Sequence, residues 1–178
     1  MELYLLRHAI ATKRDVGGYQ DDAERPLTRR GERRMRRIAR GLLSLGFRCD
    51  AVLTSPYLRS RQTADILVDA LNDGPEPLTL DALAPGGSHQ ELVAQISRLH
   101  GPDESLVLVG HQPDLGQLAS VLCTGGLSLD LNLRKGGVCR LAVSELSYGR
   151  CATLEWLLAP SQLIQLAGGK DSRAGERW

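Results

Sequence analysis

The sequence has almost no net charge and no long apolar run. Its 178 residues carry 22 basic and 21 acidic side chains, a formal net charge of +1, so no overall field selects nucleic acid or an anionic membrane as a partner. No stretch of about 18 consecutive apolar residues occurs, so no membrane-spanning helix is expected. Residues 1–8 lack the basic start and small-residue cleavage site of a signal peptide. We therefore predict a cytoplasmic protein that binds neither nucleic acid nor membrane.

Metal-binding and disulfide signatures are also missing. The four cysteines are scattered along the chain without a CxxC pair or any other metal-binding spacing: Cys49, Cys123, Cys139 and Cys151. We expect free thiols rather than a disulfide framework. No HExxH motif or nucleotide site is visible either, which disfavours a metal hydrolase. The sequence thus predicts a protein that uses no metal and no other cofactor.

Lysine is scarce, whereas arginine is abundant. Only Lys13, Lys135 and Lys170 are lysines, and the other 19 of the 22 basic residues are arginines, whose planar forks suit phosphate. The densest run covers residues 29–37 and has no interleaved aromatic side chains, which argues against a nucleic-acid site. We interpret this run as a solvated helix face, and the alternative is a surface that docks an acidic protein substrate.

Strand-like and helix-like segments alternate along the chain. Short apolar runs predict strands, and apolar side chains at helical spacing predict helices. The expected strands cover residues 2–6, 51–54, 106–109, 137–143 and 151–158, with a weaker one at 127–132. The expected helices begin after Thr28, at Ser55-Pro56, after Ser88 and at Pro113, residues that favour helix starts. This alternation predicts a three-layer α/β/α fold with a mostly parallel central sheet.

The chain contains no internal repeat and no linker in its first 166 residues. We expect a single domain over residues 1–166, a polar tail over residues 167–178, and a monomer. Residues 10–27 show neither a helical nor a strand period. A stretch of that length inside a domain is usually functional or disordered.

Three of the predicted strands end in polar signatures. These are Leu6-Arg7-His8-Ala9, Thr54-Ser55-Pro56 and Val109-Gly110-His111. Ligands bind at the carboxyl ends of parallel strands, so His8 and His111 are expected to meet there. Arg59 lies in the first turn of the next helix, and helical side chains lean toward the helix N-terminus, over the same edge. Two histidines, two arginines and a helix start form a pocket that suits a phosphoryl group.

Four blocks of the sequence, in order, resemble the histidine phosphatase superfamily, also called phosphoglycerate-mutase-like. Leu6-Arg7-His8-Ala9 is similar to its RHG signature, with alanine in place of the usual glycine. The other three blocks are Arg25-Pro26-Leu27-Thr28-x-x-Gly31, Ser55-Pro56-x-x-Arg59-x-x-Gln62-Thr63-Ala64 and Val109-Gly110-His111. The resemblance spans residues 2 to 160. The short chain and Leu83-Ala84-Pro85-Gly86-Gly87 resemble the SixA-type phosphohistidine phosphatases within this superfamily.

The resemblance implies a catalytic role for four residues and a substrate-binding role for a fifth. His8 would attack phosphorus as a neutral imidazole, with its other ring nitrogen held by a backbone carbonyl. Arg7, Arg59 and Arg25 would grip the phosphoryl oxygens, and His111 would donate to the same oxygens. Water would then hydrolyse the phosphorylated His8.

A general acid is harder to find in the sequence. Many family members carry a carboxylic acid after the third strand, whereas this chain has Ser88-His89-Gln90-Glu91 there. Glu91 is explained by a capping box with Ser88. Asp22 and His89 are the other candidates for the substrate pocket. SixA-type enzymes resemble this chain in lacking a dedicated acid, which favours a phosphoramidate substrate.

Three functions stay open on the sequence alone. The first is a phosphatase that removes phosphate from histidine on a signalling, histidine-phosphotransfer protein. The second is a phosphatase of small phosphomonoesters that uses Asp22, His89 or Glu91 as the acid. The third is a protein that only binds phosphorylated partners, which the nucleophile His8 argues against. A phosphoglycerate mutase is disfavoured because the insertion and the acid of such enzymes are missing.

Overall fold

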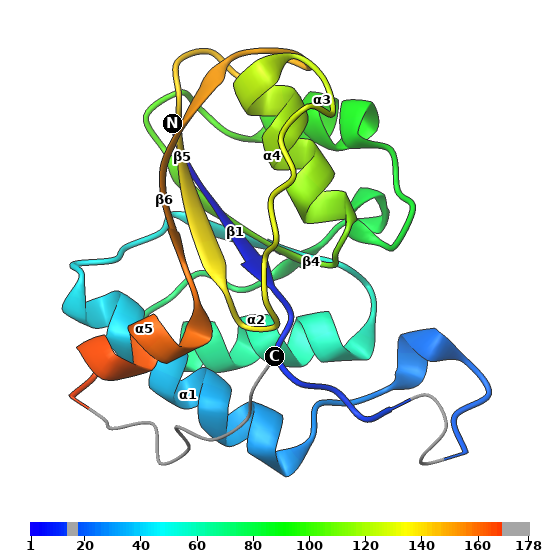
Figure 1. Ribbon diagram of the computed structural model, residues 1–178, viewed down its shortest axis with the longest axis vertical. Coiled ribbons are helices and arrows are strands. Elements are labelled where there is room, and N and C mark those ends of the chain that lie inside the picture. Colours follow the sequence, from blue (N-terminus) through cyan, green and yellow to red (C-terminus); the bar gives the residue numbers. More distant parts are fainter. Residues whose placement is uncertain (14–17, 169–178) are drawn as a thin grey trace.

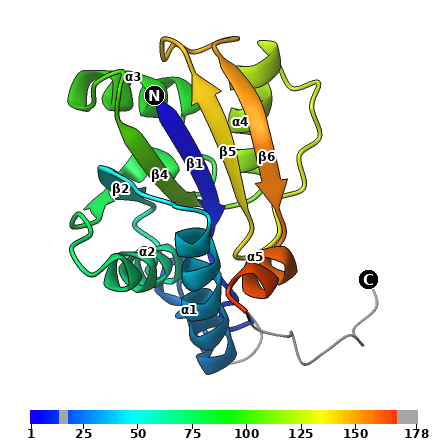
Figure 2. The same ribbon diagram turned by 90° about the vertical axis from the view of Figure 1, so that its left-hand side faces the viewer.

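A six-stranded sheet runs through the middle of the molecule in the computed structural model, which describes residues 1–13 and 18–168 (Figure 1). The strands are β1 (Glu2–Arg7), β2 (Ala51–Thr54), β3 (Leu78–Thr79), β4 (Ser105–Gly110), β5 (Val138–Val143) and β6 (Ala152–Leu158). Their order is β3-β2-β4-β1-β5-β6, which can be followed from β2 to β6 in Figure 2. β3, β2, β4 and β1 are parallel, and β5 and β6 are antiparallel to their neighbours. The predicted α/β fold with a mostly parallel sheet is confirmed.

Helices cover both faces of this sheet. They are α1 (Arg29–Ser44), α2 (Leu58–Leu71), α3 (His89–Leu99), α4 (Asp114–Thr124) and α5 (Pro160–Leu166), with 3-10 turns η1 (Asp22–Glu24) and η2 (Asp81–Leu83). Figure 1 shows α3 and α4 on one side of the strands and α1, α2 and α5 on the other. Successive side chains of a strand point to opposite faces. Leu3 and Leu5 of β1 accordingly pack in the core beneath α3 and α4, and Leu6 packs in the core beneath α1 and α2.

The N-terminal caps form where the sequence predicts them for two helices. The hydroxyl of Thr28 accepts a hydrogen bond from the backbone N–H of Gly31 at 2.9 Å and begins α1. The hydroxyl of Ser88 accepts from the N–H of Glu91 at 3.2 Å and begins α3. Each cap satisfies one of the N–H groups that lack a partner in the first helical turn. The sequence therefore predicts both starts correctly.

Two local predictions are wrong, and one short helix was missed. Residues 127–132 form no strand, because their backbone runs as an irregular loop whose Leu131 carbonyl accepts from the Gln112 side chain at 2.6 Å. The helix expected at Ser55-Pro56 begins at Leu58, because Pro56 and Tyr57 form a bend. Helix α5 was not predicted, since its seven residues are too short to show a helical period. The predicted polar tail lies, beyond Gly168, outside the described residues.

The start of α1 is fitted closely against the segment that follows β1. A Cβ atom added at Gly31 would lie 2.1 Å from the carbonyl oxygen of Ile10, which also accepts the backbone N–H of Thr28 at 2.9 Å. Because this neighbour is backbone, it cannot move aside without breaking that bond. We expect Gly31→Ala to lower the free energy of unfolding by about 2–3 kcal/mol, as measured by urea denaturation. Gly126→Ala, whose added Cβ meets nothing within 4 Å, should cost much less, and equal losses in both variants would contradict the prediction.

Two further features bear on the class of protein. None of the helices within the described ranges has the length and apolar composition needed to cross a membrane. The four cysteines, all inside the described part of the chain, are free thiols, and Cys139 is buried. The expectation of free thiols is confirmed.

Candidate active site

The carboxyl ends of β1, β2 and β4 bring the three polar signatures together. The backbone N–H of His8 donates to the carbonyl of Gly110 at 3.0 Å, and that of Ser55 donates to the carbonyl of Val109 at 3.0 Å. Both bonds extend the parallel ladder one residue beyond the strands, and His111 follows directly on β4. The sheet register therefore fixes these three residues beside one another, as the sequence predicts for the two histidines.

His8 is held in the tautomer that a nucleophile needs. Its Nδ1 lies 2.7 Å from the backbone carbonyl oxygen of Ala9. A carbonyl oxygen can only accept, so Nδ1 carries the proton and Nε2 keeps its lone pair. The side chain is buried, with 6% of its surface exposed, and its ring centroid is 5.1 Å from that of His111. Nε2 is therefore the only ring atom of His8 available to attack phosphorus.

His111 has contacts on both of its ring nitrogens. Its Nε2 lies 2.8 Å from the hydroxyl oxygen of Ser55, and its Nδ1 lies 3.4 Å from NH2 of Arg59. The ring of Tyr57 packs edge-on against the imidazole at a centroid distance of 5.1 Å. The imidazole is therefore fixed in place by two residues of the segment that links β2 to α2 and by Arg59 in the first turn of α2.

Two guanidinium groups, that of the buried Arg59 and that of the half-buried Arg7, supply positive charge to the site. Arg59 is 4% exposed and its guanidinium carbon lies 4.8 Å from the ring centroid of Tyr57. NH1 of Arg7 donates to the carbonyl of Leu133 at 2.9 Å. Nε of both arginines is buried without a hydrogen-bond partner among the described residues. Donors that the protein leaves unused are available to an anion.

Asp22 in η1 and Arg25 directly after it, both predicted from the sequence as substrate-binding residues, adjoin the site. NH2 of Arg59 donates to Oδ2 of Asp22 at 2.9 Å, and NH1 of Arg59 donates to its backbone carbonyl at 2.7 Å. Nε of Arg25 donates to Oδ1 of the same carboxylate at 2.8 Å. The Asp22 carboxylate is thus an anion bound between two guanidinium groups, a position that a phosphoryl group could also take.

His89, the remaining predicted substrate-binding residue, is not linked to this cluster. Its side chain is half-buried at the start of α3, and its Nε2 has no hydrogen-bond partner among the described residues. Glu91 accepts from the side chain of Gln95 at 3.1 Å, on an exposed part of α3. Within residues 1–13 and 18–168, no hydrogen bond joins either side chain to His8 or His111. A role for His89 or Glu91 in the site stays a prediction.

Burial keeps both histidines neutral. Desolvation by burial is the main cause that lowers the pKa of His8 to about 3. The charges of Arg59 and Arg7 lower this pKa further, whereas the hydrogen bond to Ala9 raises it. Burial, followed by the charge of Arg59, lowers the pKa of His111 to about 3. Burial also lowers the pKa of Arg7 and of Arg59, and Asp22 opposes the shift of Arg59. His8 is therefore an uncharged imidazole with a free lone pair at neutral pH.

These shifts predict how stability changes with pH. The ordinary pKa of 6.5 falls to about 3 in the folded protein for both His8 and His111. Between these values the unfolded chain binds protons that the folded chain does not, so the free energy of unfolding falls as the pH is lowered from about 6.5. The slope is at most about 1.4 kcal/mol per pH unit for each ring.

Urea denaturation between pH 7 and pH 4.5 measures this slope. The double variant His8→Gln/His111→Gln should show a clearly smaller slope than the wild type over the same range. If both proteins lose stability equally between pH 6.5 and 5, the two rings titrate normally in the folded state.

Two side chains that the sequence analysis gave no role connect the parts of the site. The hydroxyl of Thr63 accepts from the N–H of Ala9 at 3.0 Å and donates to the carbonyl of Arg59 at 2.6 Å. Oε1 of Gln62 accepts from the N–H of Leu27 at 2.7 Å. One signal in the sequence could have indicated such roles. The inner face of a helix packed on a sheet is expected to be apolar, but that of α2 has the polar residues Arg59, Ser60 and Thr63.

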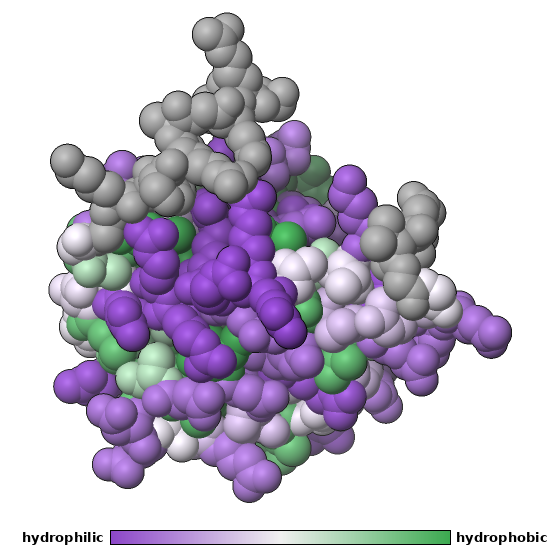
Figure 3. All heavy atoms as spheres, turned by 90° about the horizontal axis from the view of Figure 1, so that it is seen from below, coloured by the Kyte–Doolittle hydropathy of each residue, from purple (hydrophilic) through white to green (hydrophobic). Residues whose placement is uncertain are grey.

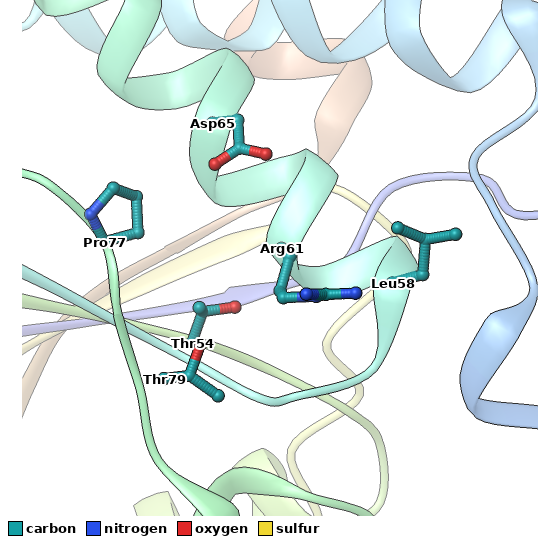
Figure 4. A pocket seen from close by; sticks show the side chains of 6 residues that line it. All are labelled: Thr54, Leu58, Arg61, Asp65, Pro77 and Thr79. Atoms are coloured by element: carbon teal, nitrogen blue, oxygen red, sulfur yellow. The ribbon is translucent and has the colours of Figure 1, made fainter.

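A second pocket lies on the other side of α2. It has a volume of about 280 Å³ and is lined by Thr54, Leu58, Arg61, Asp65, Pro77 and Thr79 (Figure 4). Residues two apart on a helix point in nearly opposite directions, so Arg61 faces this pocket while Arg59 faces the histidines. Arg61 is therefore a matched control for Arg59.

The combination of side chains suits one type of chemistry. A neutral imidazole with a free lone pair lies beside a second imidazole and the guanidinium groups of Arg7 and Arg59, which favours nucleophilic attack on a group rich in negative oxygens. No three His, Cys, Asp or Glu side chains in the described ranges cluster as a metal ion would require. The geometry defines a histidine-based phosphoryl-transfer site.

Comparison with known proteins agrees with this class. The sequence pattern of the histidine phosphatase superfamily (branch 1) matches residues 3–84. Phosphohistidine phosphatase SixA of Escherichia coli is 32% identical over 126 residues, which cover 70% of this chain and 76% of that protein. An uncharacterized protein of Picosynechococcus is 47% identical over 139 residues, or 78% of this chain and 82% of that protein. The chain belongs to the histidine phosphatase superfamily.

A solved structure narrows the assignment. The structure of the protein histidine phosphatase SixA complexed with tungstate has a TM-score of 0.79 and 27% sequence identity, and the match covers 92% of this chain and 99% of that one. Within the superfamily this chain is of the SixA type, and it is accordingly a phosphatase.

Proposed function

We propose that this chain hydrolyses phosphohistidine on a signalling protein, such as a histidine-phosphotransfer domain, through a covalent phospho-His8 intermediate and without a metal ion. The observation that carries the proposal is the bond of 2.7 Å between Nδ1 of His8 and the carbonyl of Ala9, because it leaves Nε2 free to attack. The name of the SixA relatives supports the substrate class. The free cysteines are compatible with a cytoplasmic protein.

Two steps complete the reaction. Nε2 of His8 forms a bond to phosphorus while the bond between phosphorus and the substrate's imidazole nitrogen breaks. Arg7, Arg59 and an N–H of His111 stabilise the charge on the phosphoryl oxygens. Water then attacks phospho-His8, releasing inorganic phosphate and restoring the free imidazole.

The leaving group explains why a strong general acid is not required. Phosphohistidine has a second ring nitrogen that can carry a proton, so the substrate ring can leave as neutral imidazole. An ester substrate instead leaves as an alkoxide, which needs a proton during bond cleavage. Asp22 is the one candidate acid that contacts the site, but its two guanidinium partners favour the ionised carboxylate. The pairing therefore favours the phosphoramidate substrate over small phosphomonoesters.

Phosphate release from a phosphohistidine-bearing protein and from p-nitrophenyl phosphate, each with EDTA present, tests the proposal. We expect rapid release from the phosphoprotein, slow release from the ester, and little effect of Asp22→Asn on the phosphoprotein reaction. Rapid ester hydrolysis that Asp22→Asn abolishes would instead establish the phosphomonoesterase. Loss of both activities on adding EDTA would show that a metal ion is required.

A protein substrate would meet an arginine-rich surface on α1. Arg29, Arg33, Arg36 and Arg40 are exposed, and their spacing of four, three and four residues places them on one side of the helix. Figure 3 shows hydrophilic residues gathered on the face of the molecule where α1 lies in Figure 1. The N-terminus of α1 is bonded to Ile10, two residues after His8. An acidic protein surface is therefore the complement that this stripe favours near the site.

We expect the triple variant Arg29→Glu/Arg33→Glu/Arg36→Glu to raise KM for an acidic phosphohistidine protein about tenfold, because opposite charges across an interface become like charges. Hydrolysis of a small phosphoramidate should change less than twofold. The matched control reverses three exposed arginines elsewhere, Arg48, Arg98 and Arg150. Equal effects of the two triple variants on the protein substrate would show that α1 has no specific docking role.

A further inference from the structure

The ring of His111 is bonded on one side to a serine whose role the proposed chemistry leaves open. Nε2 of His111 lies 2.8 Å from the hydroxyl oxygen of Ser55, and both residues are buried. The other ring nitrogen, Nδ1, faces NH2 of Arg59 at 3.4 Å. A guanidinium has donors only, so Nδ1 faces it as an acceptor. In this structure the ring proton is therefore on Nε2 and is donated to Ser55.

That arrangement does not suit a bound anion. Phosphoryl oxygens accept hydrogen bonds, so His111 must present an N–H to them. Nε2 is turned toward Ser55, whereas Nδ1 is on the side of Arg59, where the anion is expected. A proton on Nδ1 would serve the anion, but Nε2 of the neutral ring then becomes an acceptor and needs a donor of its own.

We propose that Ser55 is the positioning residue that gives His111 this second tautomer. A hydroxyl group both donates and accepts, so Ser55 accepts from Nε2 in the empty site and donates to Nε2 when an anion is bound. The ring remains neutral, because it releases one proton from Nε2 to water and takes up one at Nδ1 from water. This inference rests on the proposed phosphoryl site and assigns to Ser55 an effect that acts through His111.

The surroundings of Ser55 fit a hydroxyl that donates. Its Oγ already accepts from the backbone N–H of Tyr57 at 3.3 Å, and its own backbone N–H donates to the carbonyl of Val109 at 3.0 Å. When Ser55 donates to Nε2, its hydroxyl both accepts and donates, and both nitrogens of His111 are satisfied. The hydroxyl of Ser60, at 3.4 Å from Nε2, is too distant to replace a short bond.

The edge-on ring of Tyr57 limits the alternative of turning the imidazole over. Its centroid is 5.1 Å from that of His111, and the imidazole is 4% exposed. A 180° turn about χ2 would put a ring carbon in the place of each nitrogen, and it would therefore break the bond to Ser55. Reversing the direction of one hydrogen bond is the smaller change.

Nitrogen NMR of His111, with tungstate as the anion, tests the proposal without any turnover. In wild-type protein we expect Nε2 to be the protonated nitrogen before tungstate is added and Nδ1 afterwards. In Ser55→Ala with tungstate this exchange should be lost or incomplete, because Nε2 then has no donor. A wild-type ring that keeps its proton on Nε2 with tungstate bound would overturn the proposal. So would complete exchange in Ser55→Ala.

Steady-state kinetics provide a second test of the role of Ser55. We expect Ser55→Ala to lower kcat about 30-fold with a smaller change in KM, because a donor to the transition state is misplaced. Ser55→Thr keeps the hydroxyl and should recover most of kcat. If Ser55→Ala does not fold, Ser55→Cys replaces it, since a thiol of similar size is a weak donor. Thr54→Val, which removes the neighbouring buried hydroxyl, should be nearly neutral, and an equal loss in Thr54→Val and Ser55→Ala would contradict the assigned role.

These measurements separate the inference from the proposed function. A protein that binds tungstate and shows the tautomer exchange, but does not hydrolyse phosphohistidine, would support the role of Ser55 and refute the proposed substrate. A protein that hydrolyses phosphohistidine while Ser55→Ala keeps wild-type kcat would support the proposed substrate and refute the role of Ser55.

Discussion

Replacing His8 is expected to lower phosphate release by at least about 10⁴-fold, because no other imidazole in the described part of the site has a free lone pair with which to form the phosphoenzyme. Of the two histidines in the site, His8 is the one whose Nε2 keeps a free lone pair, since its Nδ1 is bonded to Ala9. His111 cannot substitute for it, because both of its nitrogens already have partners. His8→Ala should therefore lose the covalent intermediate as well as turnover.

Rapid quenching of the reaction and detection of alkali-stable, acid-labile phosphate on the protein measures that intermediate directly. His8→Asn should behave like His8→Ala, although its side-chain amide can still donate to the carbonyl of Ala9. His100→Ala is the matched control: His100 bonds to Glu104 at 2.7 Å before β4 begins, at the opposite end of the strand from His111. Substantial turnover in both His8 variants would show that water attacks the phosphorus of the substrate directly.

Arg59→Ala is the variant with the second largest expected effect, a loss of roughly 10³-fold in kcat/KM. Its guanidinium lies against His111 and is buried, so its charge acts on the phosphoryl oxygens with little screening by water. Arg59→Lys should recover only a small part of the loss, because an ammonium group cannot form two parallel bonds to a phosphoryl group. The variant also frees Asp22 from one of its two guanidinium partners.

Steady-state kinetics on the phosphohistidine protein measure this effect, and thermal unfolding shows whether the fold is retained. Arg61→Ala is the control on the same helix, since Arg61 lines the separate pocket shown in Figure 4, and it should stay within twofold of wild type. A loss below tenfold in Arg59→Ala would mean that Arg7 alone is sufficient to bind the phosphoryl group.

Local patterns in the sequence determined the elements that have a strong period or a cap. Thr28 and Ser88 begin helices, and the apolar runs of β1 and β4 are strands because both of their faces are buried. Weak or short segments were not determined in this way. Residues 127–132 contain alternating leucines that resemble a strand, but without a neighbouring strand to pair with they form a loop. Helix α5 has only seven residues and depends on packing against α1.

The sequence by itself determined the candidate nucleophile and the residues that surround it, because the strand-end signatures of His8, Ser55 and His111 must meet once their strands are parallel neighbours. Only the tertiary structure decided which atom bonds to which. The bond between Arg7 and Leu133 joins residues 126 positions apart, and the pairing of Asp22 with Arg59 joins residues 37 positions apart. Such contacts depend on sheet register and loop path, and a short window of sequence contains no period or cap that specifies either.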